Sequence, residues 1–393
     1  MSDFGIAVFG VDTFGTTYID ATAAGRAIRM APALFTADKQ NQLYDDISAE
    51  LVEGLVVLDL DLDGAKMSFE ATMKTKRAVS PFTDFVAPFL RLVYEDGSED
   101  YEQVGLFALI PAPSTHYPGR AVLDGDLGGT FPKTDGRDLC WLLQADHSTA
   151  TISMASGANV IDDAIDDLSS GGITRVNIPA STYTSTKAVD WPPGTSRLRR
   201  VNDRLMMAGY YTVVFDRHGI AMSMPYRDLA TTEPAVTYTG ENGSRIVPPV
   251  EDEPDFTRFC NRVVVIGTDP AQAPIYAIRE NTDPLSAASF DNLGQWVSRT
   301  EETPDIQTQD AADALANELI RNGTSYYRTL HIQTLPDPAR NPREVYGVEL
   351  TNADGVVADG VWHCSGWELS LDWRESRMSH YLNREERFES SIP

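Results

Sequence analysis

The stretch that decides the fold is Phe259-Cys260-Asn261-Arg262-Val263-Val264-Val265-Ile266-Gly267. Its apolar run, Val263–Ile266, predicts a strand over 262–267. A polar loop over 268–304 is expected next. A helix then begins near Thr308, ends at Gly323 and has these residues on its apolar side: Ala311, Ala312, Leu315, Leu319 and Ile320. Three further strands are predicted, over 326–334, 345–350 and 361–373. This last third is therefore an α+β portion that is mostly β.

The residues before this stretch predict a mixed α/β middle portion. The segment Pro248–Asp255 is rich in proline and acidic residues, which indicates a linker or a domain boundary. Helices are predicted over 135–144, over 159–170, and from the capping residue Ser196 to Gly209, the last with Leu198, Val201, Leu205 and Met206 on its apolar side. A hairpin is predicted over 210–224. The helix over 159–170 has a face of four carboxylates, which we interpret as solvated rather than cation-binding: Asp162, Asp163, Asp166 and Asp167.

The first portion of the chain predicts a small antiparallel barrel or sandwich. Apolar and polar residues alternate from Val56 to Leu62 and again from Ala65 to Met73, and Asp63-Gly64 supplies the turn of a hairpin. Further strands are expected over 89–94 and over 101–110. Four strands joined by short turns are typical of such β folds.

The turn of this hairpin also matches a calcium-binding pattern. Asp59, Asp61, Asp63 and Gly64, followed by Glu70, satisfy the spacing of an EF-hand loop. An EF-hand needs flanking helices, whereas Leu60 and Leu62 continue the two-residue period of a strand. Lys66 also stands where the loop normally has an apolar residue. We therefore predict a hairpin and no metal site.

Catalytic residue patterns are weak, so no catalytic, cofactor-binding or metal-binding residue is predicted and the chain is not expected to be an enzyme. His147 and His218 have acidic neighbours only in sequence, which does not make a catalytic triad. His363 and Cys364 are adjacent, but a strand points their side chains to opposite faces. The three cysteines show no paired spacing and are interpreted as buried reduced thiols: Cys140, Cys260 and Cys364.

The charge of the chain excludes several partners. Its 393 residues include 58 acidic and 32 basic ones, for a net charge of −26, and such a field repels nucleic acid. No apolar run is long enough to span a membrane, and the N-terminus lacks the basic region of a signal peptide. Only six lysines occur. Few lysines among many carboxylates fit a halophilic host, although a GC-rich genome would explain the excess of arginine equally well.

The order of these motifs resembles the baseplate hub or tail-tip proteins of long-tailed bacteriophages and related archaeal tailed viruses. Asn261–Gly267 is similar to their N-R-V-V-V-x-G strand, and Asp269–Ile275 to their D-P-x-x-x-P-I loop. The helix from Thr308 then precedes Ser325–Leu330 and the final G-W-x-L-x-L strand, here Gly366–Leu371. The hairpin over 56–73 and the segments that follow it also keep the order of the family.

This resemblance implies a trimeric hub built from two tube-like antiparallel β-barrels and an α/β middle portion. The expected domains are 1–130, 131–250 and 251–393. The hub would cap the tail tube, convert sixfold to threefold symmetry, and form the duct for the tape measure protein and the exiting DNA. Its implied partners are its own copies, the tail tube or distal tail ring, the tape measure protein, and tail fibres or receptor-binding proteins.

The implied location is the tip of the virion tail, after synthesis in the host cytoplasm. Two alternatives remain from the sequence. One is a peripheral minor tail or baseplate protein that contacts the receptor-binding apparatus. The other is a tail-tip cell-wall hydrolase, which the missing catalytic pattern disfavours.

Overall fold

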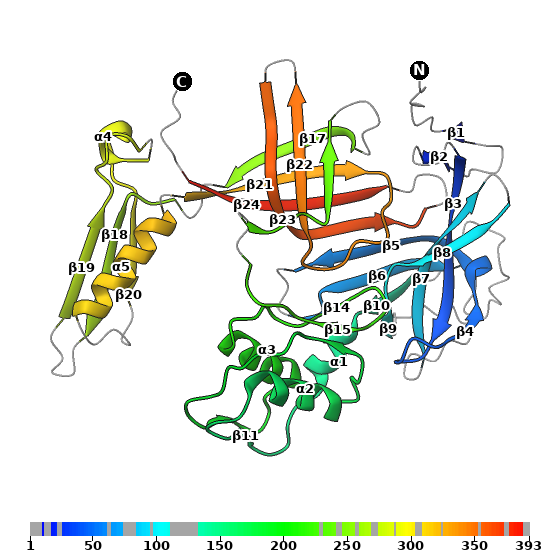
Figure 1. Ribbon diagram of the computed structural model, residues 1–393, viewed down its shortest axis with the longest axis horizontal. Coiled ribbons are helices and arrows are strands. Elements are labelled where there is room, and N and C mark those ends of the chain that lie inside the picture. Colours follow the sequence, from blue (N-terminus) through cyan, green and yellow to red (C-terminus); the bar gives the residue numbers. More distant parts are fainter. Residues whose placement is uncertain are drawn as a thin grey trace, which may run out of the picture. The chain divides into compact units, whose positions relative to one another are not determined.

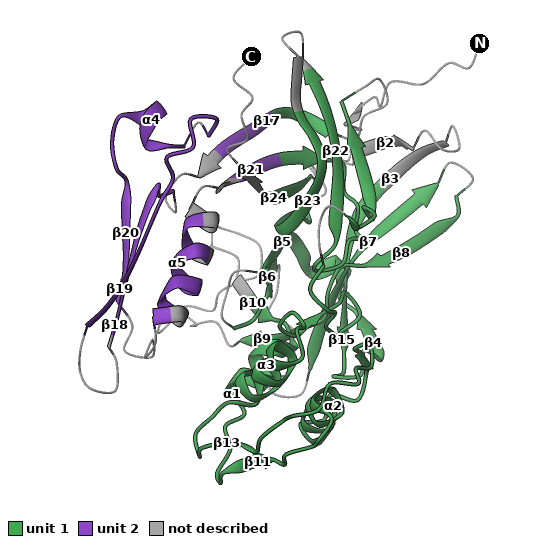
Figure 2. Ribbon diagram, turned by 60° about the vertical axis from the view of Figure 1, so that its left-hand side comes forward, with its two compact units in different colours: residues 1–249, 332–381 green, residues 250–331, 382–393 purple. Residues whose placement is uncertain are grey.

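The computed structural model divides the chain into two compact units (Figures 1 and 2). Unit 1 comprises residues 1–249 and 332–381, and unit 2 comprises residues 250–331 and 382–393. The residues that the structure describes are 10–11, 17–21, 26–60, 64–73, 84–94, 97–110, 133–227, 231–240, 246–255, 259–268, 274–286, 288–302, 309–323, 325–352, 355–372 and 377–387. The three-domain division stays a prediction.

The first portion of unit 1 is built almost entirely from strands. They are β1 (Gly10–Val11), β2 (Thr17–Ala21), β3 (Arg26–Ala37), β4 (Leu43–Asp46), β5 (Leu51–Asp59), β6 (Met67–Met73), β7 (Phe85–Tyr94), β8 (Glu99–Gln103), β9 (Phe107–Ile110) and β10 (Lys133–Arg137), with a short 3-10 helix at Ser48–Glu50.

The predicted hairpin over 56–73 is confirmed. β5 and β6 pair antiparallel, with Val56 opposite Phe69 and Leu58 opposite Met67. The predicted strand over 101–110 was wrong in one respect, because it is two strands, β8 and β9. They are separated at Gly105, where a Cβ would stand 2.3 Å from the Phe107 ring.

The middle portion adds three helices to unit 1. Its elements are α1 (Leu139–Ala145), β11 (Ile152–Met154), α2 (Val160–Ser170), β12 (Val176–Asn177), β13 (Val189–Trp191), α3 (Arg197–Met207), β14 (Val214–Phe215) and β15 (Ala221–Met222). Asn159 caps α2 and Ser196 caps α3, which confirms both predicted helices. Antiparallel β14 and β15 confirm the predicted hairpin.

Two details of the predicted helices were wrong. The helix predicted over 135–144 begins later, because Lys133–Arg137 is β10, which pairs with both β6 and β9. Asp138 then caps α1 by accepting a hydrogen bond from Cys140 N. Met206 was assigned to the apolar side of α3, yet 47% of it is exposed.

The helices share one core with the strands that precede them. Side chains from β3, β7 and β9 pack with those of all three helices, and the contributors from the helices include Leu139, Leu143, Ile161, Leu168, Leu198, Val201 and Leu205. The helices of the middle portion bury their apolar sides against the strands of unit 1. The middle portion therefore belongs to unit 1.

The last third contributes strands to both units. Its elements are β16 (Val236–Thr239), β17 (Ile246–Asp255), β18 (Arg262–Thr268), β19 (Pro274–Glu280), α4 (Phe290–Leu293), β20 (Ser298–Glu302), α5 (Gln309–Gly323), β21 (Ser325–Thr334), β22 (Val345–Asn352), β23 (Gly355–Ser370) and β24 (Met378–Arg387). The helix α5 and the strands β18, β21, β22 and β23 confirm those predicted.

Two segments of this last third differ from the prediction. Pro248–Asp255 was expected to be a linker or a domain boundary: it lies in strand β17 and is therefore not a linker, but the two units do divide within it, between Pro249 and Val250. β17 ends its sheet, and an edge strand tolerates proline because one side of its backbone needs no ladder hydrogen bonds. The expected polar loop over 268–304 contains β19, α4 and β20. β19 pairs antiparallel with β18, and β20 pairs parallel with it.

A 16-stranded sheet joins the two ends of the chain. Its main path is β1-β2-β3-β7-β9-β10-β6-β5-β23-β24-β21-β17. The central step pairs β5 with β23, and there Trp367 lies opposite Leu58 and Leu369 opposite Val56, all of them buried. The prediction of a mostly β protein with some α structure is confirmed. The two closed barrels stay a prediction, because the main path of this sheet does not close on itself among the described strands.

Candidate assembly surface

The chemistry-bearing residues singled out in the sequence are dispersed. His147 Nδ1 lies 2.7 Å from the Gly194 carbonyl oxygen, and His218 Nδ1 lies 3.1 Å from Gln103 Oε1. Burial lowers the pKa of His218. His363 and Cys364 lie on β23, where Cys364 is buried and donates to the Gly366 carbonyl at 3.4 Å. His147 and His218 thus each contact a residue far along the chain, and neither contact brings these singled-out residues together.

All three cysteines are free and buried. Burial raises the pKa of Cys364 to about 12, and it also raises the pKa of Cys140 and of Cys260. A thiol with a raised pKa carries little thiolate at neutral pH, so these groups are weak nucleophiles. This agrees with the interpretation of all three as buried reduced thiols.

The calcium-like pattern lies on a strand hairpin. Asp59 ends β5 and its N–H donates to the Lys66 carbonyl at 2.8 Å, while Glu70 is exposed in the middle of β6. Lys66 Nζ donates to the Leu60 carbonyl at 3.0 Å. Asp61 and Asp63 lie outside the described residues. The flanks of the pattern are therefore two paired strands, whereas an EF-hand requires helices.

The four carboxylates of α2 divide into two pairs. Asp162 and Asp166 are exposed as predicted. The prediction was wrong for Asp163 and Asp167, which meet three arginines of α3. The contacts, from nitrogen to carboxylate oxygen, are Arg197–Asp167 at 2.6 Å, Arg200–Asp167 at 3.0 Å, Arg204–Asp167 at 3.0 Å and Arg204–Asp163 at 2.5 Å.

These ion pairs fix the two helices against each other. The side chains of Arg200 and Arg204 are only 3% and 2% exposed. The Arg204 guanidinium also lies 4.0 Å from the centre of the Trp191 ring. Buried charges with several partners specify one packing arrangement, and removing one partner leaves an uncompensated charge. We therefore interpret the arginine–aspartate network as structural.

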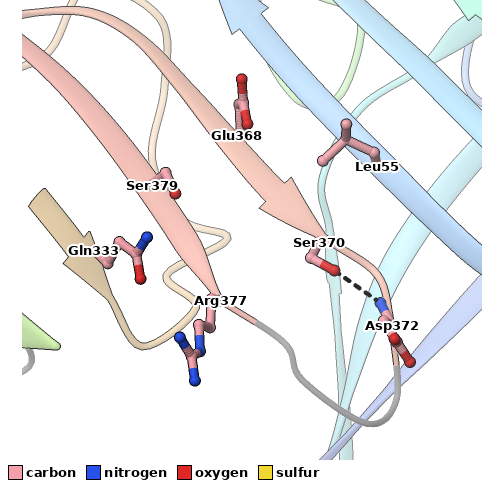
Figure 3. Close-up of a pocket in the computed structure, with 7 residues that line it drawn as sticks. All are labelled: Leu55, Gln333, Glu368, Ser370, Asp372, Arg377 and Ser379. Atoms are coloured by element: carbon pink, nitrogen blue, oxygen red, sulfur yellow. Dashed lines mark hydrogen bonds between the residues drawn. The ribbon is translucent and has the colours of Figure 1, made fainter. Parts of the chain in front are cut away.

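A shallow polar depression lies on unit 1 at β5, β23 and β24 (Figure 3). Its volume is about 280 Å³, and its lining is Leu55, Gln333, Glu368, Ser370, Asp372, Arg377 and Ser379. The Ser370 hydroxyl accepts a hydrogen bond from Asp372 N at 3.3 Å, and Glu368 accepts one from the Tyr381 hydroxyl at 3.2 Å. The depression therefore offers charges of both signs to a partner.

Among the described residues, no three histidine, cysteine, aspartate or glutamate side chains are grouped as metal ligands. No helix in the described ranges is long and apolar enough to cross a membrane.

Large apolar side chains are, in contrast, exposed on both units. On unit 1 they are Leu43, Tyr44, Tyr101, Tyr183, Met206, Met207 and Tyr226. On unit 2 they are Tyr276, Ile278, Leu285 and Leu293. Apolar patches of this kind mark interaction surfaces when they are contiguous.

Two of these residues of unit 2, Tyr276 and Ile278, lie on a small three-stranded sheet. Helix α5 lies across one face of the sheet β19-β18-β20 (Figure 1), and there Val263, Val265 and Ala277 pack against Ala312 and Ala316. On the opposite face, Tyr276 is 56% exposed and Ile278 is 53% exposed. We call this the open face, formed by Val264, Ile266, Tyr276 and Ile278.

Sequence reasoning missed the open face. The apolar run of β18 was recognised, but β19 was assigned to a loop, so the pairing of Ile266 with Tyr276 and of Val264 with Ile278 was not foreseen. A usable signal was present: Pro274-Ile275-Tyr276-Ala277-Ile278 is a short apolar run just after the first strand.

No family model matches the sequence, and no curated protein matches it either. Solved structures do share its fold. A tail protein from Neisseria meningitidis MC58 matches with a TM-score of 0.56 and 13% identity, over 90% of this chain and 97% of that one. The 43 kDa tail protein of prophage MuSo2 from Shewanella oneidensis matches with a TM-score of 0.56 and 10% identity, over 89% and 97%.

A complex of PdpA and VgrG from Francisella also matches, with a TM-score of 0.51 and 10% identity, over 93% of this chain and 58% of the matched one. The fold thus extends through nearly the whole length of both tail proteins. The resemblance found in the sequence is confirmed at the level of the fold: the chain has the fold of phage tail proteins.

Proposed function

We propose that this protein is a structural component of a virion tail: a trimeric hub at the tail tip that caps the tail tube and converts sixfold to threefold symmetry. One observation supports the proposal above the others. The fold matches over 90% of this chain and 97% of the Neisseria tail protein, so the likeness is not confined to a common submotif. Because many functions share one fold, the role itself requires an experiment.

The architecture supports this role in two ways. Strands from both ends of the chain enter one sheet, which could supply each subunit with two tube-like β surfaces over the domains 1–130 and 251–393. Three subunits would then present six such surfaces to a sixfold tube. The proposed partners are the tube or distal tail ring, the tape measure protein, and fibres or receptor-binding proteins.

The deciding experiment combines mass in solution with imaging. Analytical ultracentrifugation of the purified 43.2 kDa chain should give a trimer, and cryo-electron microscopy of assembled tails should place three copies at the tip. Six copies in a flat ring, or a monomer decorating the periphery, would favour the alternative of a minor baseplate protein. Degradation of cell walls by the purified chain would favour the hydrolase.

The charge supports a duct through which DNA passes without adhering. The net charge of −26 should keep a duplex from binding at about 0.15 M salt, because phosphate binding requires clustered lysine and arginine. An electrophoretic mobility assay should therefore show no shifted band. A clear shift that disappears at higher salt would contradict the proposed lining of the duct.

A further inference from the structure

The sequence of β18 is that of a strand covered on both faces. Val263-Val264-Val265-Ile266 is continuously apolar, and such runs occur in strands that are buried on two sides. β19 repeats the pattern with Ile275-Tyr276-Ala277-Ile278. An antiparallel strand with one face in water would instead alternate between apolar and polar residues.

Unit 2 itself supplies a cover for only one of these faces. Val263, Val265 and Ala277 are at most 2% exposed beneath α5. The described elements of unit 2 leave the other face open, with Tyr276 and Ile278 more than half exposed. The register places Ile266 opposite Tyr276 and Val264 opposite Ile278, so the four side chains form one contiguous patch.

The open face is nearly neutral within a strongly acidic chain. At one end, Arg262 and Glu280 form an ion pair at 2.8 Å, and the Arg262 guanidinium lies 4.0 Å from the centre of the Trp296 ring. Trp296 in turn stacks on Phe290, with ring centres 4.5 Å apart. At the other end, the register places Glu302 beside Ile266 as the one uncompensated charge on the described part of this face.

This charge pattern indicates what kind of partner fits. A basic partner would find complementary charge over most of the surface of a chain with a net charge of −26. A partner that shares the acidic charge is repelled from that surface, and it needs a neutral apolar patch on which to dock. The like-charged protein always present at assembly is a second copy of this chain.

We infer that the open face of unit 2 is a self-association surface, which docks on a neighbouring copy of the chain. This inference rests on the proposed trimer. A closed ring of three copies uses a heterologous contact, so the open face meets a different surface of its neighbour. Unit 1 has exposed apolar residues of the required chemistry, among them Tyr44 and Tyr226.

The test compares the same substitution at two exposed tyrosines of the full-length chain. Tyr276→Asp places a charge in the open face, and Tyr183→Asp adds the same charge at a residue of unit 1 that is 44% exposed. In sedimentation equilibrium we expect Tyr276→Asp to raise the dissociation constant of the trimer by about 100-fold or more, as loss of an aromatic anchor does. Tyr183→Asp should leave the dissociation constant unchanged.

The outcomes separate the inference from the proposed function. Trimers of undiminished affinity in Tyr276→Asp would overturn the docking surface and leave the trimeric hub standing. A wild-type chain that stays monomeric at all concentrations would overturn the trimer, and the inference with it.

Melting temperatures at a concentration where wild type is monomeric provide a further control. They should agree for wild type and both variants. A lower value for Tyr276→Asp alone would mean that its own chain covers the face, and would also overturn the inference.

Discussion

Two antiparallel hairpins of this chain, β5–β6 in unit 1 and β18–β19 in unit 2, distribute their apolar residues differently. β6 alternates strictly, with Met67, Phe69, Ala71 and Met73 buried and Glu70 exposed between them. β18 and β19 are apolar on both faces, and α5 covers one of them. The alternating strand β6 exposes a polar residue to water, whereas β18 and β19 expose a second apolar side.

The helices of the two units are also held differently, and this contrast gives the largest expected effect. In unit 1, Asp167 is 9% exposed and bonds three arginines, whereas in unit 2 the Arg279–Asp313 pair is 34% and 37% exposed. Asp167→Ala should lower the free energy of unfolding by about 3–5 kcal/mol, because it leaves buried arginines uncompensated.

Denaturant unfolding would measure this change. Asp166→Ala, on the exposed side of the same helix, is the matched control and should stay within about 0.5 kcal/mol of wild type. Equal losses in the two variants would refute the structural role of the arginine–aspartate network.

The hairpin β5–β6 depends on a close approach by β23. A Cβ at Gly366 would stand 2.5 Å from the Leu58 carbonyl oxygen, so one of the paired backbones would have to move. Gly366→Ala should therefore destabilise unit 1 by about 3 kcal/mol, the upper range for overpacking.

A thermal melt would show this loss as a lower midpoint. Gly54→Ala on β5 serves as the control, since its Cβ would have ordinary contacts at 3.4 Å. If both variants melt together, the close pairing of β5 with β23 is not what holds the sheet.

The hairpin β5–β6 is also tied to α1 by one buried carboxylate. Asp138 accepts hydrogen bonds from Lys66 N and Met67 N at 2.9 Å and from Cys140 N at 3.0 Å. Burial nevertheless raises the pKa of Asp138 to about 6, from the ordinary 3.8. The folded state thus binds a proton more tightly than the unfolded state does, so this group favours folding at low pH, and its contribution is lost as the pH rises through about 6.

Relative to Asp138→Asn, wild type should lose about 2–3 kcal/mol of stability between pH 4 and pH 7, at about 1.4 kcal/mol for each pKa unit. Urea unfolding of both proteins at several pH values measures this difference directly. A difference that is constant with pH, or that grows in favour of wild type as the pH rises, would contradict the raised pKa.

The two faces of β18 can be compared with a single type of substitution, which has the smallest expected effect. Val263 is fully buried under α5, and its neighbour Val264 points to the open face. Val263→Ala should cost about 1.5–3 kcal/mol, the value of a buried apolar side chain, and Val264→Ala much less in the monomer. Hydrogen exchange of unit 2 would distinguish the two, and equal protection in both variants would mean that the second face is covered as well.

The sequence predicted those elements whose local pattern decides their structure. The alternation in 56–73 and the capped helices at Asn159 and Ser196 were sufficient, because periodicity and capping act over a few residues. β3 was missed, since Pro32 interrupts a segment without alternation, yet it pairs with β7 over ten residues. Such pairing comes from a partner far along the chain, which no local pattern reveals.

The surfaces were harder to predict than the strands. Asp163 and Asp167 have the same spacing on α2 as any solvated acidic face, and only the arrival of the arginines of α3 distinguishes them from Asp162 and Asp166. The open face likewise required the pairing of β18 with β19. The order of the motifs along the sequence predicted the fold, whereas the contacts between helices and strands could be identified only in the structure.

The pairing of β5 with β23 has a consequence for synthesis on the ribosome. Asp59 and its partner Gly366 are separated by about 300 residues, which take about 15–60 s to translate at 5–20 residues per second. During that interval β5 is complete on one side through β6, while its other edge lacks the strand that closes it. An open, apolar edge is a template for pairing between nascent chains. Yield in a host should therefore depend on chaperones that bind this edge until residues 355–370 emerge.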